Sequence, residues 1–424
     1  MIRFLIKGLM RDKSRSRLPV IVVSIGVMLT VFMHAYINGF MGDTLEMNAR
    51  FAYGHVKVMT RAYAEEMDQR PNDLALIGVE DLKTELAERF PGMDWGARIQ
   101  FGGLIDVPDE DGETRSQGTA MGIGLDLLSG NSKEVDRLGI DRSMVRGSLP
   151  DRPGQALLSE SFSRKLDIEP GDDITLISSS MNGSMVMANF TVSGTLSFGV
   201  EVMDRGTIIM DIEDARLALD MHDAAGEIIG FLPGGFYDDE VAVKTAKAFN
   251  EAYTDDADEF APVMKSLSQQ GSMGAYVELS AVWALYVSAI FIFAMSLVLW
   301  NAGLLGGLRR YGEVGIRIAM GEEKGHVYRS MIYESIIIGF VGSVIGTSLG
   351  LGIAWIIQVH GINIEGMMEG ASMMMPSEIR TRITPPDFYI GFIPGLLSTA
   401  IGTMLSGIGI YKRQTARLFK ELEA

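Results

Sequence analysis

The sequence predicts a membrane protein with four transmembrane α-helices and a large α+β extracytoplasmic domain inserted between helices 1 and 2. Two observations support this prediction. Four long stretches are nearly free of charged residues, and more than two hundred residues separate the first stretch from the other three. A helix needs about 20 apolar residues to cross the hydrocarbon core of a bilayer, and each stretch reaches that length. We therefore predict transmembrane helices over residues 18–42, 276–308, 334–360 and 387–411.

Lysine and arginine in the flanks predict the side of the membrane on which each connection lies. These residues resist translocation, whereas acidic residues have little effect. They are frequent in 1–17, 309–333 and 412–424 and scarce in 361–386. We therefore expect both termini and the connection 309–333 to be cytoplasmic, and the domain 43–275 and the loop 361–386 to lie outside. Apolar and basic residues interleave in 1–17, which predicts an amphipathic helix on the cytoplasmic membrane surface.

The predicted extracytoplasmic domain accounts for the acidity of the chain. The net charge is -17, and residues 43–278 hold 20 Lys and Arg against 43 Asp and Glu. Nucleic-acid binding is excluded, because a polyanionic partner requires the opposite charge. The chain has no cysteine. Disulfide bonds and thiolate metal sites are therefore excluded, and a hydrophobic core must hold the domain together.

Periodicity within this domain indicates an α+β fold. Asp111 and Gly112 stand between two strand-like runs, which predicts a β-hairpin. The other predicted elements are a half-buried strand at 51–60, a helix at 78–90, a β-rich subdomain at about 154–199, and helices at 212–219 and 239–252.

No group of residues predicts catalysis, a metal site or a cofactor site. His34, His55, His222 and His326 are far apart in the sequence, so we expect a structural role for each. No G-x-x-x-x-G-K-[ST] pattern occurs, so the chain does not hydrolyse ATP by that route. We expect no charged pair inside the spans, which argues against an ion pathway. The methionine-rich stretch 366–375 is expected to contact lipid or an adaptable partner rather than Cu(I).

The connection 309–333 has the most specific local pattern in the chain. Glu313 and Arg317 are one helical turn apart and can form an ion pair, while Gly321 predicts a break. The pattern predicts a short helix between two membrane helices. A basic connector needed only for topology is the alternative interpretation. The residues predicted to act in this connection are Glu313, Arg317, Gly321, Glu322, Glu323 and Lys324.

Glycine residues in the third predicted span indicate close helix packing. Gly342, Gly346 and Gly350 recur every four residues, so one face of the helix is nearly bare and a second helix can approach it. Packing among spans two to four of the same chain and contact with a second copy both remain open. The first span, rich in Val, Ile, Met and Phe, is the better candidate for a dimer seam or for a wall facing a lipid substrate.

The connection also resembles a known signature. Its pattern R-R-x-G-E-x-G-I-R-x-A-M-G, followed by Glu334 at the start of a glycine-rich span, is similar to the cytoplasmic signature of FtsX-like permeases of ABC transporters. The topology of this FtsX-like/MacB-like superfamily resembles the predicted one over the whole chain. Four segments are similar to its lipoprotein-releasing (LolC/LolE-type) branch: 37–60, 122–127, 156–176 and 190–219.

The resemblance implies a location and a set of partners. Residues 43–275 would be a MacB-like periplasmic core domain, and the chain would lie in the inner membrane of a bacterium. Gly321 to about Arg329 would form a coupling helix that docks on a separate ABC-type ATPase dimer, which binds the ATP. The other implied partners are a second copy or a related permease, membrane lipids, a lipoprotein cargo taken from the outer leaflet, and a periplasmic acceptor.

Two other functions remain open. The first is a permease for efflux of drugs or peptides. The second is a mechanotransmission or signalling subunit whose external domain activates a partner and moves no substrate.

Overall fold

The chain divides into two compact units, which are described separately. The computed structural model describes residues 13–109, 111–130, 132–199, 201–253, 258–308, 310–363 and 378–412. Of the described residues, the helical unit comprises those within 13–41, 280–363 and 378–412, and the sheet unit those within 42–279. Several sequence predictions concern residues outside the described ranges: most of the amphipathic helix 1–17, Arg309, the methionine-rich stretch 366–375 and most of the tail 412–424.

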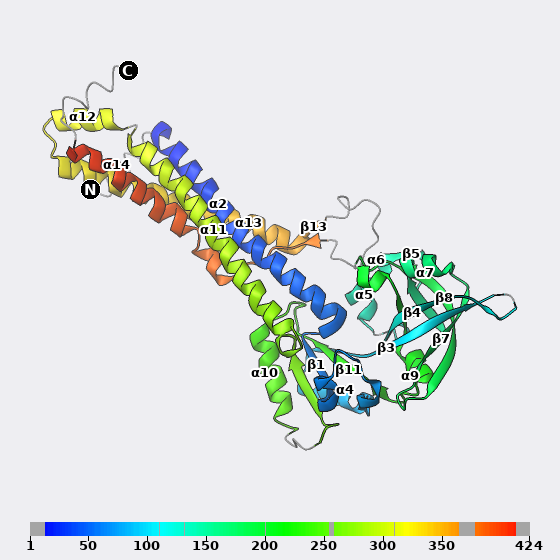
Figure 1. The fold of residues 1–424 in the computed structure, drawn as a ribbon. Helices are drawn as coiled ribbons and strands as arrows, with labels where there is room; N and C mark the ends of the chain where they lie inside the picture. The colour runs from blue at the N-terminus through cyan, green and yellow to red at the C-terminus, as the bar shows by residue number, and fades with distance from the viewer. Residues whose placement is uncertain are drawn as a thin grey trace. The chain divides into compact units, whose positions relative to one another are not determined.

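Long helices that lie side by side form the helical unit (Figure 1). They are α2 (Lys13–Asn48), α11 (Met273–Leu308), α13 (Lys324–His360), and a fourth helical segment composed of η5 (Pro385–Phe388), η6 (Ile393–Ser398) and α14 (Thr399–Lys412). All four are long and apolar enough to cross a membrane. Pro394 has no N–H to donate, and the wide turn η6 precedes the regular helix α14. Two further elements complete the unit: the short helix α12 (Tyr311–Ala319), and the pair of strands β13 (Ile362–Asn363) and β14 (Glu378–Ile379).

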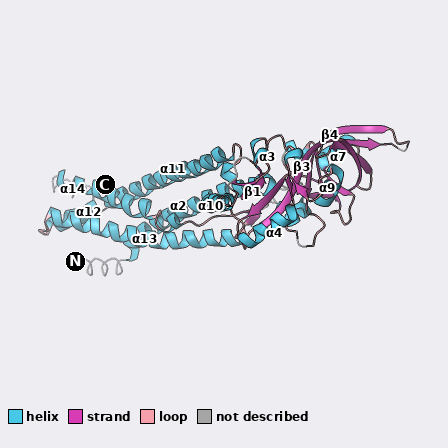
Figure 2. Cartoon of the chain, turned by 90° about the horizontal axis from the view of Figure 1, so that it is seen from below, coloured by secondary structure: helices cyan, strands magenta, loops and turns pink. Residues whose placement is uncertain are grey.

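The sheet unit is built on a ten-stranded sheet, whose strands are magenta in Figure 2. The strand order is β12-β1-β11-β3-β4-β9-β6-β8-β5, and β7 pairs with β3 and β8. The strands are β1 (Val56–Thr60), β3 (Asp94–Pro108), β4 (Thr114–Leu125), β5 (Met144–Gly147), β6 (Gln155–Ser159), β7 (Asp173–Ser179), β8 (Met185–Leu196), β9 (Thr207–Asp211), β11 (Glu227–Phe231) and β12 (Pro262–Ser266). A separate pair is formed by β2 (Leu76–Ile77) and β10 (Ala224–Ala225).

Short helices connect these strands. They are η1 (Ala49–Tyr53), α3 (Arg61–Glu65), η2 (Asn72–Leu74), α4 (Val79–Arg89), α5 (Glu134–Leu138), α6 (Ile140–Ser143), α7 (Glu160–Leu166), α8 (Glu201–Asp204), α9 (Ile212–Leu219), α10 (Asp239–Asn250) and η3 (Leu267–Gln269). The predicted helices at 78–90, 212–219 and 239–252 are confirmed as α4, α9 and α10.

Strand β3 joins the two ends of the sheet. Its residues 94–98 pair with β11 and its residues 103–106 with β7, while β4 follows its other edge. The β3–β4 hairpin confirms the turn predicted at Asp111 and Gly112. Strands β6, β7 and β8 fall in the predicted β-rich subdomain 154–199, but β6 also pairs with β9 and β7 with β3. The β-rich part is therefore larger than the predicted range and is continuous with the rest of the sheet.

The first strand differs from its prediction in two ways. It begins only at Val56, because helical turns continue from α2 through η1 to Tyr53. Both of its faces are buried, because Val56 and Val58 belong to the large hydrophobic core and Met59, on the opposite face, packs with Tyr63 of α3. The alternation had predicted a half-buried strand. Lys57 can lie in this buried strand because its ammonium group is 2.5 Å from the Glu227 carboxylate. A charge inside a core requires such a partner.

Candidate functional site

Helix α12 folds back against the start of α13. Tyr311 and Val314 of α12 form a small apolar cluster with Val327 and Met331 of α13. Burial of these side chains fixes the orientation of α12, because a helix with one apolar stripe turns that stripe toward the protein. The opposite side of the same connection stays exposed.

A glycine turn ends this helix and starts the next one. Gly321 has φ +95°, a left-handed conformation that favours glycine. The turn brings Glu322 back over α12, where Arg317 Nε and Nη2 donate to Glu322 Oε2 and Oε1 at 2.7 and 2.9 Å. His326 Nδ1 lies 2.7 Å from Glu322 Oε1. These hydrogen bonds, from His326 first and then from Arg317, lower the pKa of Glu322.

The predicted ion pair between Glu313 and Arg317 is therefore wrong. Arg317 makes a forked contact with Glu322 instead, which is stronger than an i, i+4 pair on a helix surface. Sequence spacing alone could not reveal this partner, because it depends on the reversal of the chain at Gly321. Glu313 lies in the first turn of α12.

The remaining predicted residues lie at the beginning of α13. Glu323 is the N-cap residue, and its carbonyl oxygen accepts hydrogen bonds from His326 N and Val327 N. Lys324 is the first residue of α13. The segment predicted as a coupling helix, Gly321 to about Arg329, is thus a turn followed by the first residues of a long helix. The separate short helix is α12.

Two contacts hold the connection to the rest of the helical unit. Arg310 and Glu334 of α13 form a forked ion pair, with Arg310 Nη2 2.8 Å from Glu334 Oε1. The Tyr311 hydroxyl donates to the carbonyl oxygen of Ser406 in α14.

The tip of the connection is apolar and exposed, with Ile316 46% and Met320 75% accessible. A braced helix with an exposed apolar tip is suited to binding another protein. Neither side chain was among the predicted residues, although their i, i+4 spacing places them on one helix face.

The glycine stripe of α13 contacts α2. A Cβ atom on Gly342 would lie 2.6 Å from Val23 Cγ1, one on Gly346 2.5 Å from the Ser24 carbonyl oxygen, and one on Gly350 2.9 Å from the Met28 carbonyl oxygen. The partner is therefore span one of the same chain, which neither of the two open alternatives named. The α2 face that α13 covers cannot also serve as a dimer seam. Another face of α2 stays exposed at Leu18, Ile21, Ile25 and Leu29.

A buried ionisable pair connects α2 to the start of the fourth span. His34 Nδ1 lies 2.7 Å from Asp387 Oδ1, and the Asp387 side chain is fully buried. The same carboxylate accepts hydrogen bonds from Thr384 N and Oγ1. The expectation of no charged pair inside the spans took no account of this contact, which is a charged pair only when His34 is protonated. The two residues are 353 positions apart, and Asp387 is the first residue of its predicted span, so it was counted as part of the flank.

In the sheet unit, a buried hydrogen-bond network surrounds the last turns of α2. Leu232 N donates to His55 Nδ1 at 2.9 Å, so the proton of a neutral imidazole is on Nε2. That group lies 2.8 Å from Glu46 Oε2, which also accepts a hydrogen bond from Tyr237 N. His55 is fully buried and joined to both neighbours, as a structural histidine would be, and its structural role stays a prediction. The network ties the end of α2 to β11 and to the segment that follows it.

The segment that leads into α11 is bound to the segment that follows α2. β12 pairs with β1 over five residue pairs. Leu267 N donates to the His55 carbonyl oxygen, and Gln270 Nε2 donates to the Tyr53 carbonyl oxygen at 3.2 Å. Within the sheet unit, therefore, the residues that lead out of α2 and those that lead into α11 are held together by short hydrogen-bonded connections.

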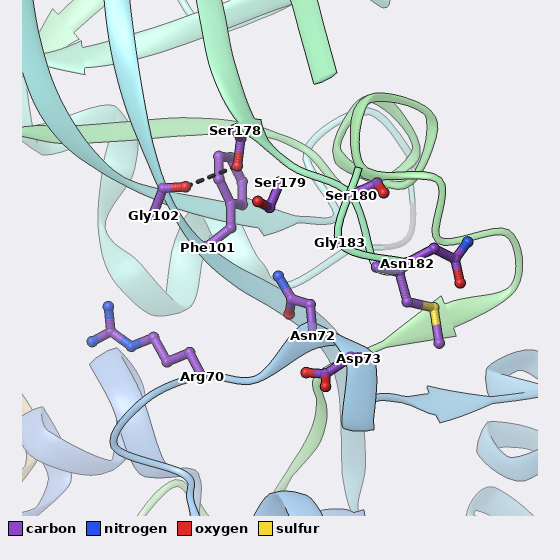
Figure 3. A pocket seen from close by; sticks show the side chains of 11 residues that line it. Arg70, Asn72, Asp73, Phe101, Gly102, Ser178, Ser179, Ser180, Asn182 and Gly183 are labelled. Carbon is purple, nitrogen blue, oxygen red and sulfur yellow. Dashed lines mark hydrogen bonds between the residues drawn. The ribbon is translucent and has the colours of Figure 1, made fainter. Parts of the chain in front are cut away.

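A polar pocket of about 530 Å³ lies in the sheet unit between η2, β3 and the β7–β8 turn (Figure 3). Its lining includes Asn72, Asp73, Asn182 and the serines that follow Ile177. Ser178 Oγ donates to the Gly102 carbonyl oxygen at 2.8 Å. Within the described ranges, no group of three or more His, Asp or Glu side chains could hold a metal ion. The prediction that the chain needs no metal or cofactor stays a prediction.

Two family models match this sequence. The FtsX-like permease C-terminal model matches residues 285–415, and the MacB-like periplasmic core domain model matches residues 18–257. The chain is also 30% identical over 78 residues to the macrolide export ATP-binding/permease protein MacB of Hyphomonas neptunium. This match covers 18% of this chain and only 12% of that protein.

Two solved structures have weak similarity. One is the periplasmic region of MacB from Actinobacillus actinomycetemcomitans, with 12% identity and a TM-score of 0.35, covering 50% of this chain and 87% of that one. The other is a domain described as part of a permease from Porphyromonas gingivalis, with 13% identity and a TM-score of 0.31, covering 52% and 93%. Similarity at this level supports no conclusion about fold or function.

The two family models together show the family to which the chain belongs. The MacB-like match alone covers more than half of it, and the FtsX-like match covers the later helices. The chain belongs to the family of ABC-transporter permeases that combine a MacB-like periplasmic core domain with an FtsX-like C-terminal region.

Proposed function

We propose that this chain is the transmembrane subunit of a bacterial inner-membrane ABC transporter, in which a separate ATPase dimer drives movement of the periplasmic sheet unit. One observation supports this proposal above the others. The strand that follows α2, β1, pairs with the strand that precedes α11, β12. A hydrogen bond from Gln270 to Tyr53 also joins the two segments. A change in the relative position of these two helix ends would therefore act directly on the sheet.

The proposed ATPase contact is the exposed end of the connection between α11 and α13. Ile316 and Met320 supply apolar surface, and Glu322, Glu323 and Lys324 lie at the turn beside them. In this proposal both termini and the connection lie in the cytoplasm and the sheet unit in the periplasm, which the lysine and arginine distribution supports. The described parts of the chain include the braces that would carry a push on α12 into α13 and α14.

The proposed cargo is a lipoprotein extracted from the outer leaflet of the inner membrane and passed to a periplasmic acceptor. The similarity of 37–60, 122–127, 156–176 and 190–219 to the LolC/LolE-type branch supports this cargo. Withdrawing an acyl chain costs about 0.8 kcal/mol per CH₂ group, which calls for an ATP-driven step. External pulling supplies that step without a channel through the bundle. A second permease copy or a related permease would complete the complex.

Efflux is the second candidate function. Its support is the MacB of Hyphomonas neptunium, whose name describes macrolide export. A signalling subunit that moves no substrate is the third.

Depletion of the chain separates these functions. In the lipoprotein function, mature lipoproteins that normally reach the outer membrane accumulate in the inner membrane after depletion. Normal sorting with increased macrolide sensitivity would instead support efflux. Normal sorting and normal sensitivity would leave the signalling function.

A further inference from the structure

An apolar cavity of about 220 Å³ lies inside the helical unit. Residues of α2, α11, α13 and α14 line it. The cavity exists because α11 has small residues where the helices meet. Gly306 lines it, and a Cβ atom added there would have no atom within 4 Å other than those of its chain neighbours and its own helix backbone.

The polar groups in the cavity wall are already satisfied. Ser335 Oγ donates to the Ile332 carbonyl oxygen at 2.9 Å, and Thr399 Oγ1 donates to the Gly395 carbonyl oxygen at 2.6 Å. The rest of the wall is mainly aliphatic and includes Val22, Val23 and Ile338. Cavities lined in this way hold no water and bind apolar molecules; an engineered cavity of about 150 Å³ accepts benzene. The chemistry of the wall therefore selects a hydrocarbon.

The cavity opens toward the lipid-facing surface of the unit. Leu18 of α2 and Leu305 of α11 both line it, and they are 60% and 47% exposed. In a bundle that crosses a membrane, exposed leucines of this kind contact lipid chains. Arg310 also lines the cavity, and its guanidinium is held by Glu334. In the proposed orientation, this arginine marks the cytoplasmic leaflet.

We propose that this cavity binds one acyl chain of a cytoplasmic-leaflet lipid, inserted between α2 and α11. The occupant follows from the continuity of the aliphatic wall with the lipid-facing leucines. The inference depends on the assignment of these helices to the membrane and not on the identity of the cargo. The inserted acyl chain would lie between α2, which leads into β1, and α11, which follows β12. A bound lipid would therefore set the spacing between these two helices.

Photolabelling of the full-length protein tests this proposal. The protein is placed in phosphatidylethanolamine and phosphatidylglycerol vesicles that contain a phospholipid with a diazirine in the middle of one acyl chain. After irradiation, labelled peptides are identified by mass spectrometry. We expect labelling at 18–23 and 302–307 to be at least fivefold that at Trp355, a lipid-facing residue of α13 that is 59% exposed.

Two matched glycine variants distinguish an inserted chain from ordinary lipid contact. Gly306→Leu fills the cavity, whereas Gly352→Leu places the same side chain at another helical glycine with open space around it. We expect Gly306→Leu to reduce labelling at 18–23 at least fivefold and Gly352→Leu to leave it unchanged. Val22→Ala enlarges the cavity and should increase labelling, which keeps the test decisive if Gly306→Leu does not fold.

Two results would overturn the proposal: labelling at 18–23 equal to that at Trp355, or labelling at 18–23 that responds to neither Gly306→Leu nor Val22→Ala.

Discussion

Glu322 is the residue on which the geometry of the turn at Gly321, the proposed ATPase contact, depends most. Its carboxylate joins Arg317 at the end of α12 to His326 in α13, across the left-handed Gly321. The folded-state pKa of Glu322 is below its ordinary value of 4.5, because these hydrogen bonds stabilise the charged form. The ion pair therefore contributes fully above pH 4.5 and is lost as the pH falls through the lowered pKa.

Glu322→Gln should weaken binding of the ATPase. The substitution keeps the size of the side chain but removes the charge that holds Arg317. Because the pair is partly exposed, the expected loss is about 0.5–1 kcal/mol, or roughly two- to fivefold in affinity. Co-purification and titration of the ATPase measure it, with Glu251→Gln in the sheet unit as the control. Equal affinity for both variants would show that the turn does not contact the ATPase.

Asp214 in α9 gives a pH-dependent prediction of the opposite sign. Burial raises its pKa above the ordinary value of 3.8, despite the hydrogen bond that it accepts from Gly154 N. The charged form therefore costs stability above the raised pKa, and this cost disappears as the pH falls through that pKa. Asp214→Asn should slow amide exchange in α9 at pH 7, with a gain that shrinks toward acidic pH. A gain independent of pH would contradict this.

At the scale of elements, the contact between α2 and α13 depends on the absence of side chains. Gly346→Leu would put a Cβ atom 2.5 Å from the Ser24 carbonyl oxygen of α2, a backbone atom that cannot move independently of its helix. Overpacking of this kind costs about 1–3 kcal/mol. Thermal unfolding in detergent should show a clear loss for Gly346→Leu and little change for Gly352→Leu. If both variants unfold at the wild-type temperature, the stripe does not pack as described.

The elements that could be predicted from the sequence are those specified by local patterns. Helix α4 follows from apolar spacing up to Pro91, and the β3–β4 hairpin from Asp111 and Gly112. The burial of both faces of β1 could not be predicted, because it depends on side chains far along the chain that form the hydrophobic core with Val56 and Val58. The contacts between His34 and Asp387 and between Arg317 and Glu322 likewise depend on chain reversals and helix packing. The family resemblance, in contrast, rested on a contiguous motif.

At the scale of the whole molecule, the proposed transmission depends on a series of contacts, each described within its own unit. α12 is braced to α13 and α14, α13 packs on α2 through three glycines, and the ends of α2 and α11 enter paired strands. Gly321→Pro would disrupt the turn between α12 and α13, where the proposed transmission begins, because proline fixes φ near -65° and the turn needs +95°. The variant should keep the sheet unit folded and abolish ATP-dependent changes in it.

Amide exchange in the reconstituted complex with its ATPase tests the central claim most directly. Exchange at 49–60 and 262–273 is compared between the nucleotide-free state and the state trapped with ATP and vanadate. The proposed transmission predicts that trapping changes protection in both segments in the wild type and in neither segment of Gly321→Pro. Unchanged protection in the wild type, or the same change in the variant, would contradict transmission through this connection.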